Sequence, residues 1–385
     1  MSAATPEIYE DLSQLASHLR ATQKKYTILF AHNGTGKTRL SMEFSRLGKE
    51  NGGQDTLYFN AFTEDLFSWD NDLDKGEIRV LKFNKDSNFF DGLDGVGMED
   101  KIRVFLHTLT DFDFKIDYNK NKIVFNRMVD GRLQMEDGGY ILTEDGNHLS
   151  VTTKEENIKI SRGEENIFIW CFFLAIAQMA IDGDESYKWV KYIYIDDPIS
   201  SLDDNNVVAV GAGLAKLLKA GDDKMNIKTV ISTHHGMFYN VLYNELKKAS
   251  KSFLNKLPSN RGYSLIQTDD TPFFHHVVLV QMLKRAIDTD KLYTYHFSIL
   301  RNILEKTAAF HGFSKFSDCI NKCDDEVIHS RRINILSHGN YSIFEPTEMQ
   351  EENKEHFKAV LSGFLETYKF NKDLFEKLEQ NQIKV

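Results

Sequence analysis

The chain has 385 residues, of which 41% are hydrophobic, 27% are charged and only 5 are proline. This composition excludes collagen-like, disordered and disulfide-scaffold proteins, and the length predicts two or three domains. The formal net charge of −10 argues against a protein that coats nucleic acid through bulk electrostatics. Three cysteines and a mixed, charged N-terminus without a signal-peptide pattern favour a location in the cytoplasm.

Strand patterns that alternate with helical patterns predict a parallel α/β sheet in the first two thirds of the chain. The predicted strands are residues 26–31, 56–62, 190–196 and 227–233. Helices are expected at 164–181 and 205–219, and alternating residues with turn signals predict a small antiparallel sheet in an insert near 111–150. The apolar stretch 167–181 is shorter than the ~20 residues of a membrane span, so it predicts a buried core helix and no membrane contact.

The sequence changes character after about residue 260. Residues 274–311 and 353–380 have helical spacing of apolar and aromatic residues with few glycines. The segment LPSNRGYS lies in 255–270 and indicates a linker. We therefore expect a nucleotide-binding domain at 1–262 and a mainly α-helical domain at 263–385.

The first motif that carries chemistry follows the first predicted strand and precedes a helical pattern. AHNGTGKT (31–38) has the spacing and context of a P-loop, with Ala31 in place of the first consensus glycine. Backbone N–H groups of such a loop surround phosphate oxygens at the positive end of the next helix. Lys37 is expected to reach the β- and γ-phosphates and Thr38 to bind Mg²⁺. The other expected nucleotide-binding positions are Asn33, Gly34, Thr35 and Gly36.

A second element is the apolar strand YIYI that ends in Asp196 and Asp197, as in a Walker B motif. Asp196 is expected to hold Mg²⁺, and Asp197 is expected to polarise the attacking water. Most ATPases of this kind carry glutamate at the second position. Because aspartate is one methylene shorter, hydrolysis is expected to be slower or differently positioned.

Three further segments complete a recognisable order along the chain: SRGEE (161–165), DDPISSLDD (196–204) and STHH (232–235). Together with the P-loop they resemble the signature, Walker B, D-loop and His-switch of ABC/SMC-type ATPase heads. The resemblance implies that Ser161 and Gly163 act on a nucleotide held by a second subunit, so the active unit is at least a homodimer. It also implies that Asp203 belongs to the D-loop and that His234 senses the γ-phosphate in its own subunit.

The C-terminal third contains a candidate nuclease helix. Phe297, Leu300, Leu304 and Ala308 recur at the spacing of one buried helix face, and Arg301 and Glu305 form an (i, i+4) pair. Such a pair is often a plain surface ion pair. Together with His338, it is also a set suited to metal-free RNA cleavage. Spacing alone does not decide between these two readings.

Six segments resemble the PrrC-type bacterial anticodon nucleases, and they span most of the chain in order. They are YFNAFTEDLFSWDNDL (58–73), ISRGEENIFIW (160–170), YIYIDDPISSLDDN (192–205), STHHGMFYNVLYNEL (232–246), YHFSILRNILEKTAAFHGF (295–313) and INILSHG (333–339). The resemblance implies an ABC-like head fused to a helical RNase domain. It also implies a nuclease triad of Arg301, Glu305 and His338.

The resemblance further implies a substrate and a biological setting. The expected reaction cuts lysine tRNA on the 5′ side of the wobble base and leaves 2′,3′-cyclic phosphate and 5′-hydroxyl ends, in a suicide response to phage. ATP or GTP with Mg²⁺ would gate the nuclease, thymidine triphosphate would stabilise its active form, and the nuclease step itself would need no metal. A type I restriction–modification complex is the expected silencing partner. Tyr295, His296, Lys306 and Lys315 are candidates for RNA contacts.

Two other functions remain open from the sequence. The first is a nucleotide-dependent switch or scaffold that recruits a separate effector, in which Arg301 and Glu305 are only a structural pair. The second is a nucleotide-gated DNase, which is disfavoured because no carboxylate cluster for a two-metal nuclease stands outside the Walker B segment.

Overall fold

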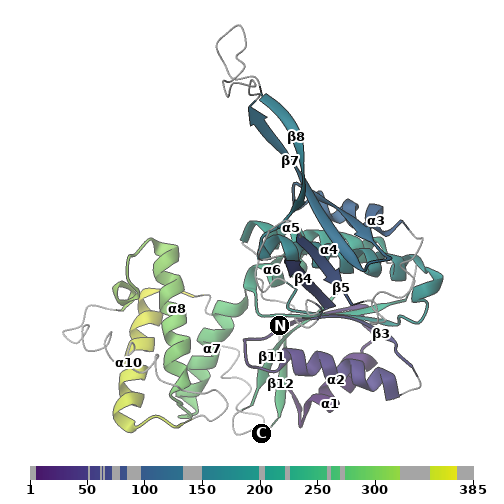
Figure 1. The fold of residues 1–385 in the computed structure, drawn as a ribbon. Helices are drawn as coiled ribbons and strands as arrows, with labels where there is room; N and C mark the ends of the chain where they lie inside the picture. The colour runs from purple at the N-terminus through teal and green to yellow at the C-terminus, as the bar shows by residue number, and fades with distance from the viewer. Residues whose placement is uncertain are drawn as a thin grey trace. The chain divides into compact units, whose positions relative to one another are not determined.

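The computed structural model describes twelve parts of the chain: residues 6–50, 53–60, 63, 66–71, 79–84, 97–132, 150–198, 204–221, 226–257, 262–268, 274–320 and 347–370. The chain divides into two compact units, which are described separately (Figure 1). One unit consists of residues 1–15, 31–36 and 251–385, and the other consists of residues 16–30 and 37–250.

Four parallel strands form the centre of the second unit, in the order β2, β10, β9, β3. Their bounds are β2 (Tyr26–Phe30), β3 (Thr56–Phe59), β9 (Tyr192–Asp196) and β10 (Lys228–Thr233). All four predicted strands are confirmed, with ends that differ by up to three residues. Their apolar character follows from their position, because strands of a parallel sheet are covered on both faces.

Helices cover the two faces of these strands (Figure 1). Phe44 of helix α2 packs edge-on against Tyr194 of β9, with ring centroids 5.1 Å apart. On the opposite face, Phe59 of β3 packs against Trp170 of helix α4 at 5.1 Å. The helices of this part are α2 (Lys37–Glu50), α3 (Met98–Leu106), α4 (Arg162–Asp182), α5 (Asp204–Ala220) and α6 (Gly236–Glu245), and α1 (Leu12–Ala21) precedes them in the chain.

Helix α4 is apolar on all sides because it lies in the core. Within the described residues it is the one helix with the length and hydropathy of a membrane span, and 89% of its apolar window is buried inside the protein. This burial confirms the predicted core helix. Its start is fixed by a capping box, in which the Ser161 hydroxyl accepts from the Glu164 backbone N–H and the Glu164 carboxylate accepts from the Ser161 N–H.

A second, antiparallel sheet packs on α4. Its strands run in the order β4, β5, β7, β6, and β8 pairs with β7. The bounds are β4 (Phe67–Asn71), β5 (Arg79–Phe83), β6 (Phe112–Asp117), β7 (Lys122–Arg132) and β8 (Ser150–Ile158). The rings of Phe114 and Phe125 pack against the ring of Phe168 in α4, with centroids 4.9 and 5.1 Å away. The sheet is larger than the predicted insert because β4, β5 and part of β8 lie outside 111–150.

The first unit contains three antiparallel strands and a group of helices. Strand β12 (Tyr263–Gln267) lies between β1 (Glu7–Tyr9) and β11 (Ser250–Lys256). The expected domain boundary after residue 262 therefore falls between two paired strands, and the helices begin only at α7. The helical bounds are α7 (Phe274–Asp288), α8 (Tyr295–His311), the short 3-10 helix η5 (Phe316–Cys319) and α10 (Glu351–Thr367).

The helices of the first unit enclose a core of their own. The predicted apolar face of α8 is confirmed, because Phe297, Leu300 and Leu304 are each 0% exposed and Ala308 is 3% exposed. Phe357 from α10 packs edge-on against Phe297, with ring centroids 5.3 Å apart. Burying side chains of this size stabilises a fold by about 2 kcal/mol each. This packing fixes which face of α8 points outward.

Candidate functional site

The P-loop joins β2 directly to α2, as the sequence predicts. Two of its glycines have positive φ, +80° for Gly34 and +106° for Gly36. L-residues with a side chain rarely adopt these angles, so glycine at these positions lets the backbone turn sharply before α2. Helix α2 begins at Lys37, which places Lys37 and Thr38 in its first turn.

Lys37 belongs to a partly buried polar cluster with Asp197 and His234. Lys37 Nζ lies 3.1 Å from Asp197 Oδ2, and the Lys37 side chain is only 6% exposed. His234 Nδ1 lies 2.7 Å from the same carboxylate oxygen, and the His234 backbone N–H donates to Asp197 Oδ1 at 3.0 Å. Because an ionised carboxylate only accepts hydrogen bonds, Nδ1 carries the proton in this arrangement. The fold thus brings together the P-loop lysine, the second Walker B carboxylate and the His-switch residue.

Asp197 occupies an unusual backbone conformation in this cluster. Its φ is +52°, a left-handed angle that aspartate tolerates better than most residues with a side chain. The Asp197 N–H donates to the carbonyl of Ser232 at 2.8 Å, which ties the end of β9 to β10. Such angles cluster at functional sites, where the surrounding structure holds them in place.

The first Walker B carboxylate lies beside Thr38. Thr38 Oγ1 donates to Asp196 Oδ2 at 2.7 Å, and Ser232 Oγ donates to Asp196 Oδ1 at 2.7 Å. Asp196 is 1% exposed. A hydroxyl and a carboxylate oxygen are hard ligands, and Mg²⁺ is usually bound by one or two protein oxygens together with phosphates and waters. The chemistry of Thr38 and Asp196 therefore fits a Mg²⁺ ion that accompanies a nucleotide.

The two carboxylates differ in their electrostatics. Burial raises the pKa of Asp196 above its usual value, and the hydrogen bonds from Ser232 and Thr38 offset this only in part. Burial would also raise the pKa of Asp197, but the hydrogen bond from His234 and the charge of Lys37 outweigh it and the pKa is lowered. Asp197 therefore remains ionised at neutral pH. A metal at Asp196 would lower the pKa of that carboxyl in turn.

The SRGEE segment lies on a different element, at the start of α4. Ser161 is exposed at the N-cap, and a Cβ added to Gly163 would meet no atom within 4 Å. Glu164 is held by an ion pair with Arg127, which also contacts Asp111 at 3.0 Å. The expected signature residues are thus open at the surface of the second unit, at the positive end of a 21-residue helix.

Two of the three candidate nuclease residues are described, both on α8. Arg301 Nε donates to Glu305 Oε1 at 2.7 Å, with side chains 21% and 47% exposed. The Arg301 guanidinium also lies over the ring of Phe316, 5.5 Å from its centroid. The pair therefore sits at the edge of the buried face, with the guanidinium beside an aromatic ring. His338, like the D-loop residue Asp203, lies outside the described residues.

His296 does not occupy the surface position expected of an RNA contact. It is 2% exposed, and its Nδ1 accepts from the backbone N–H of Tyr293 at 3.1 Å. Burial lowers the pKa of His296 to about 4. The helix turns this residue inward with Phe297, whereas Lys306 and Lys315 are exposed and Tyr295 is half-buried.

The buried His296 predicts an acid-sensitive helical core. The unfolded chain takes up a proton near pH 6.5, whereas the folded protein does so only near pH 4, so stability falls as the pH drops between these values. We expect this residue to account for a loss of up to roughly 3 kcal/mol. His296→Gln, which keeps an acceptor for Tyr293, should remove most of that loss in urea unfolding at pH 7.5 and 5.0. Equal acid sensitivity in His296→Gln and in the exposed-site control His311→Gln would contradict this account.

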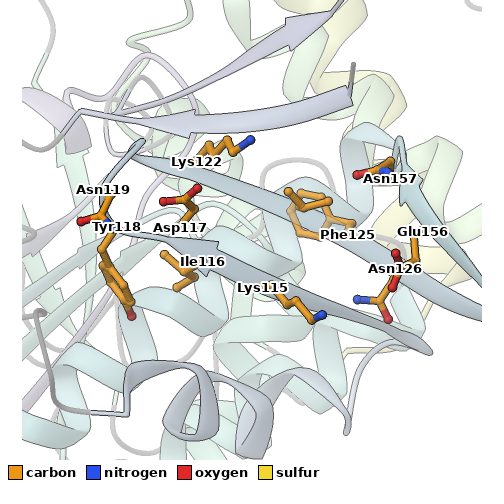
Figure 2. A pocket seen from close by; sticks show the side chains of 11 residues that line it. Lys115, Ile116, Asp117, Tyr118, Asn119, Lys122, Phe125, Asn126, Glu156 and Asn157 are labelled. Atoms are coloured by element: carbon orange, nitrogen blue, oxygen red, sulfur yellow. The ribbon is translucent and has the colours of Figure 1, made fainter. Parts of the chain in front are cut away.

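One cavity of the described residues lies on the antiparallel sheet. It has a volume of about 800 Å³ and is bordered by side chains such as Lys115, Lys122, Asn126 and Glu156 (Figure 2). A cavity of about 460 Å³ lies near the start of α4, where Glu164 and residues 107–111 line it. None of the P-loop or Walker B residues lines either cavity, so neither is the nucleotide site.

Three residues of the nucleotide site were not expected from the sequence. Ser232 bonds Asp196. Ser41 lies in α2 and donates from Oγ to the carbonyl of Thr38 at 2.8 Å, and the Tyr58 hydroxyl contacts Ser41 Oγ. Tyr58 lies in the distinctive segment 58–73 and Ser232 opens the STHH motif. Their positions in these segments were the one available signal.

The fold and this cluster define a P-loop nucleotide-binding head joined in one chain to a helical part. A family model described as an AAA domain matches residues 138–366, more than half of the chain. The chain is 30% identical to the protein named "Anticodon nuclease" from Escherichia coli, over 96% of this chain and 99% of that protein. It belongs to the anticodon nuclease family. A solved SmcHead, bound to the C-winged helix domain of ScpA, is 11% identical and covers 64% of this chain and 90% of its own, with a TM-score of 0.31.

Proposed function

We propose that this protein is a nucleotide-gated endoribonuclease that cuts tRNA in the anticodon loop. The observation that carries the proposal is the extent of the match to the Escherichia coli anticodon nuclease, which covers 96% of the chain and so includes both the P-loop head and the helical part. A protein that shared only the head would match over the head alone. The Arg301–Glu305 pair on α8 adds a chemically suitable group in the helical part.

The head is the gate in this proposal. Lys37 would bind the β- and γ-phosphates of ATP or GTP, and Thr38 and Asp196 would hold Mg²⁺, which neutralises phosphate charge. Binding of the nucleotide would draw Lys37 away from Asp197, because the phosphates compete for the same ammonium group. Asp197 would then be released to orient water, with His234 at the γ-phosphate.

The second half of each nucleotide site would come from another copy of the chain. Ser161 is exposed and Gly163 is partly exposed at the start of α4, where backbone N–H groups and the helix dipole favour an anion. Asp203 of the D-loop is assigned to the same interface. The active species is therefore a homodimer of heads or a larger homo-oligomer.

The helical part would carry the RNA chemistry. Glu305 and His338 would share the roles of base toward the ribose 2′-hydroxyl and acid toward the leaving 5′-oxygen. Arg301, which lies over the ring of Phe316, would stabilise the negative charge that develops on the phosphate. This route uses no metal in the nuclease step and leaves a 2′,3′-cyclic phosphate and a 5′-hydroxyl.

The proposed setting is defence against phage in the bacterial cytoplasm. The substrate is lysine tRNA, cut on the 5′ side of the wobble base, and a type I restriction–modification complex keeps the protein silent until infection. Thymidine triphosphate is a further candidate ligand that stabilises the active form. Exposed Lys306 and Lys315 are the candidates for contacts with RNA phosphates.

The decisive experiment maps the breaks that the purified protein makes in total bacterial tRNA. We expect a single break in the anticodon loop of lysine tRNA in the presence of Mg²⁺ with ATP or GTP, with a cyclic phosphate at the new 3′ end. His338→Ala should abolish it. Breaks that end in 3′-hydroxyl and 5′-phosphate would contradict the proposed chemistry.

The same experiment tests the switch or scaffold alternative. An (i, i+4) arginine–glutamate pair is a common feature of helix surfaces, so its presence does not by itself require catalysis. A protein that hydrolyses the nucleotide but leaves every tRNA intact, with and without nucleotide, would favour that alternative.

A further inference from the structure

A chain of hydrogen bonds runs from the first turn of α2 into the end of β3. Ser41 Oγ donates to the carbonyl of Thr38 at 2.8 Å and lies 2.8 Å from the hydroxyl of Tyr58. Asn60 Nδ2 donates to the same hydroxyl at 2.5 Å. Because the single proton of Ser41 is used toward Thr38, the Tyr58 hydroxyl must donate to Ser41 and accept from Asn60. The direction of every bond in the chain is therefore fixed.

Asn60 is itself held in place by hydrogen bonds with Thr63. Its side-chain oxygen accepts from the backbone N–H of Thr63 at 3.2 Å, and its own backbone N–H donates to Thr63 Oγ1 at 3.0 Å. Ser41 is 0%, Asn60 1% and Thr63 5% exposed. Polar side chains buried to this degree are costly unless they are bonded, and apolar residues would fill such a space at lower cost. The connection is thus a built polar network inside the head.

The packing of β3 directs Tyr58 toward this network. Successive side chains of a strand point to opposite faces, and Phe59 is packed between Trp170 and Phe173 of α4 at 5.1 and 4.9 Å. Tyr58 must therefore face α2, where its ring also meets that of Tyr194, two residues before Asp196. Burial raises the pKa of Tyr58 to about 12, and the charge of Asp196 contributes in the same direction. The hydroxyl thus keeps its proton at neutral pH.

We propose that Tyr58 is a positioning residue for the Mg²⁺ end of the nucleotide site and that Asn60 orients it. The Tyr58 hydroxyl donates a hydrogen bond to Ser41, and Ser41 donates one to the carbonyl of Thr38. The hydroxyl of Thr38 in turn donates to Asp196. This assignment gives a role to the first residues of the segment 58–73. It rests on the proposed nucleotide-binding function of the head and does not depend on the nuclease.

The test compares two variants, in each of which one tyrosine loses only its hydroxyl group. Tyr58→Phe removes the proposed positioning bond. Tyr26→Phe removes a buried hydrogen bond in the same unit, from Tyr26 to the carbonyl of Leu218 at 2.9 Å. Tyr26 is the first residue of β2, and the P-loop follows the other end of that strand. The measurement is the equilibrium affinity for a non-hydrolysable ATP analogue, titrated with Mg²⁺ and repeated without metal, together with the melting temperature.

We expect Tyr58→Phe to raise the Mg²⁺ concentration for half-maximal binding about tenfold, as loss of a group behind a metal ligand commonly does. Its affinity without Mg²⁺ should stay within about twofold of wild type. Asn60→Ala should change the metal requirement in the same direction, and Tyr26→Phe should not change it.

A Tyr58→Phe protein with the Mg²⁺ requirement of wild type would overturn the inference, as would an equal shift in Tyr26→Phe. If wild type itself binds no nucleotide with Mg²⁺, both this inference and the proposed function of the head fail. Failure of this inference alone is therefore distinguishable from failure of the proposed function of the head.

Discussion

Lys37→Ala is expected to abolish nucleotide binding by the head and, with it, tRNA cleavage. The Lys37 ammonium is the buried cation of the P-loop, and its side chain is 6% exposed beside Asp197. Without it, the β- and γ-phosphates would face two carboxylates with only Mg²⁺ to compensate the negative charge. Loss of one such group from a preorganised site typically costs about 100- to 1,000-fold in rate, and we expect a loss of at least that size in nucleotide hydrolysis.

The control for this prediction is Lys49→Ala, which removes an exposed lysine from the same helix. Binding of a fluorescent nucleotide and release of phosphate should be normal in that variant. Lys37→Met keeps the aliphatic stem and serves as a second variant if the alanine protein is unstable. Full cleavage by a Lys37 variant in the absence of nucleotide would contradict gating by the head.

Arg301→Ala and Glu305→Gln are expected to abolish RNA cleavage and to leave nucleotide hydrolysis unchanged. Removing a guanidinium from a developing phosphate charge typically costs about 100- to 1,000-fold, and removing a general acid or base about 100- to 10,000-fold. The pair lies partly exposed on α8, and an exposed pair contributes only about 0–1 kcal/mol to folding. The protein should therefore remain folded while the cleavage rate collapses.

Asn302→Ala supplies the matched control, because Asn302 is the exposed neighbour of Arg301 on the same helix. It should cleave at the wild-type rate. The measurement is a single-turnover cleavage time course with lysine tRNA, run beside a phosphate-release assay on the same preparations. If both Arg301→Ala and Glu305→Gln cleave within about threefold of the wild-type rate, the Arg301–Glu305 pair has only a structural role. A parallel loss of cleavage and nucleotide hydrolysis would lead to the same conclusion.

Elements whose pattern is local could be predicted well from the sequence. The four parallel strands are short, fully apolar runs, and the P-loop adds glycines and a lysine at fixed spacing directly after β2. The buried face of α8 follows from three- and four-residue spacing alone. Helix α4 was recognisable as a core helix because the apolar stretch within it, residues 167–181, is shorter than the ~20 residues of a membrane span.

The contacts that complete the nucleotide site could not be predicted in this way. Tyr58 and Ser41 are 17 residues apart, and Thr38 and Asp196 are 158 apart. Sequence order places Asp196 at the end of a strand, but only the neighbouring position of β10 brings Ser232 to its second oxygen. Such partners are set by the order of strands in the sheet, which local spacing does not encode.

The helical part shows a second limit. Residues 274–311 have continuous helical spacing, yet α7 ends at Asp288 and α8 begins at Tyr295. Asp290 takes a left-handed φ of +52° in the connection, without the glycine or proline that usually marks a break. His296 then turns into the core, so a residue type common at RNA interfaces has a structural role here.

Gating of the nuclease by the head can be measured as the rate of lysine tRNA cleavage by wild-type protein with and without Mg²⁺ and ATP or GTP. We expect a cut in the anticodon loop that accelerates at least about tenfold with nucleotide, and that disappears in Glu305→Gln although hydrolysis continues. Cleavage at the same rate in both conditions, or cleavage that survives in Glu305→Gln, would contradict a nuclease gated by the head.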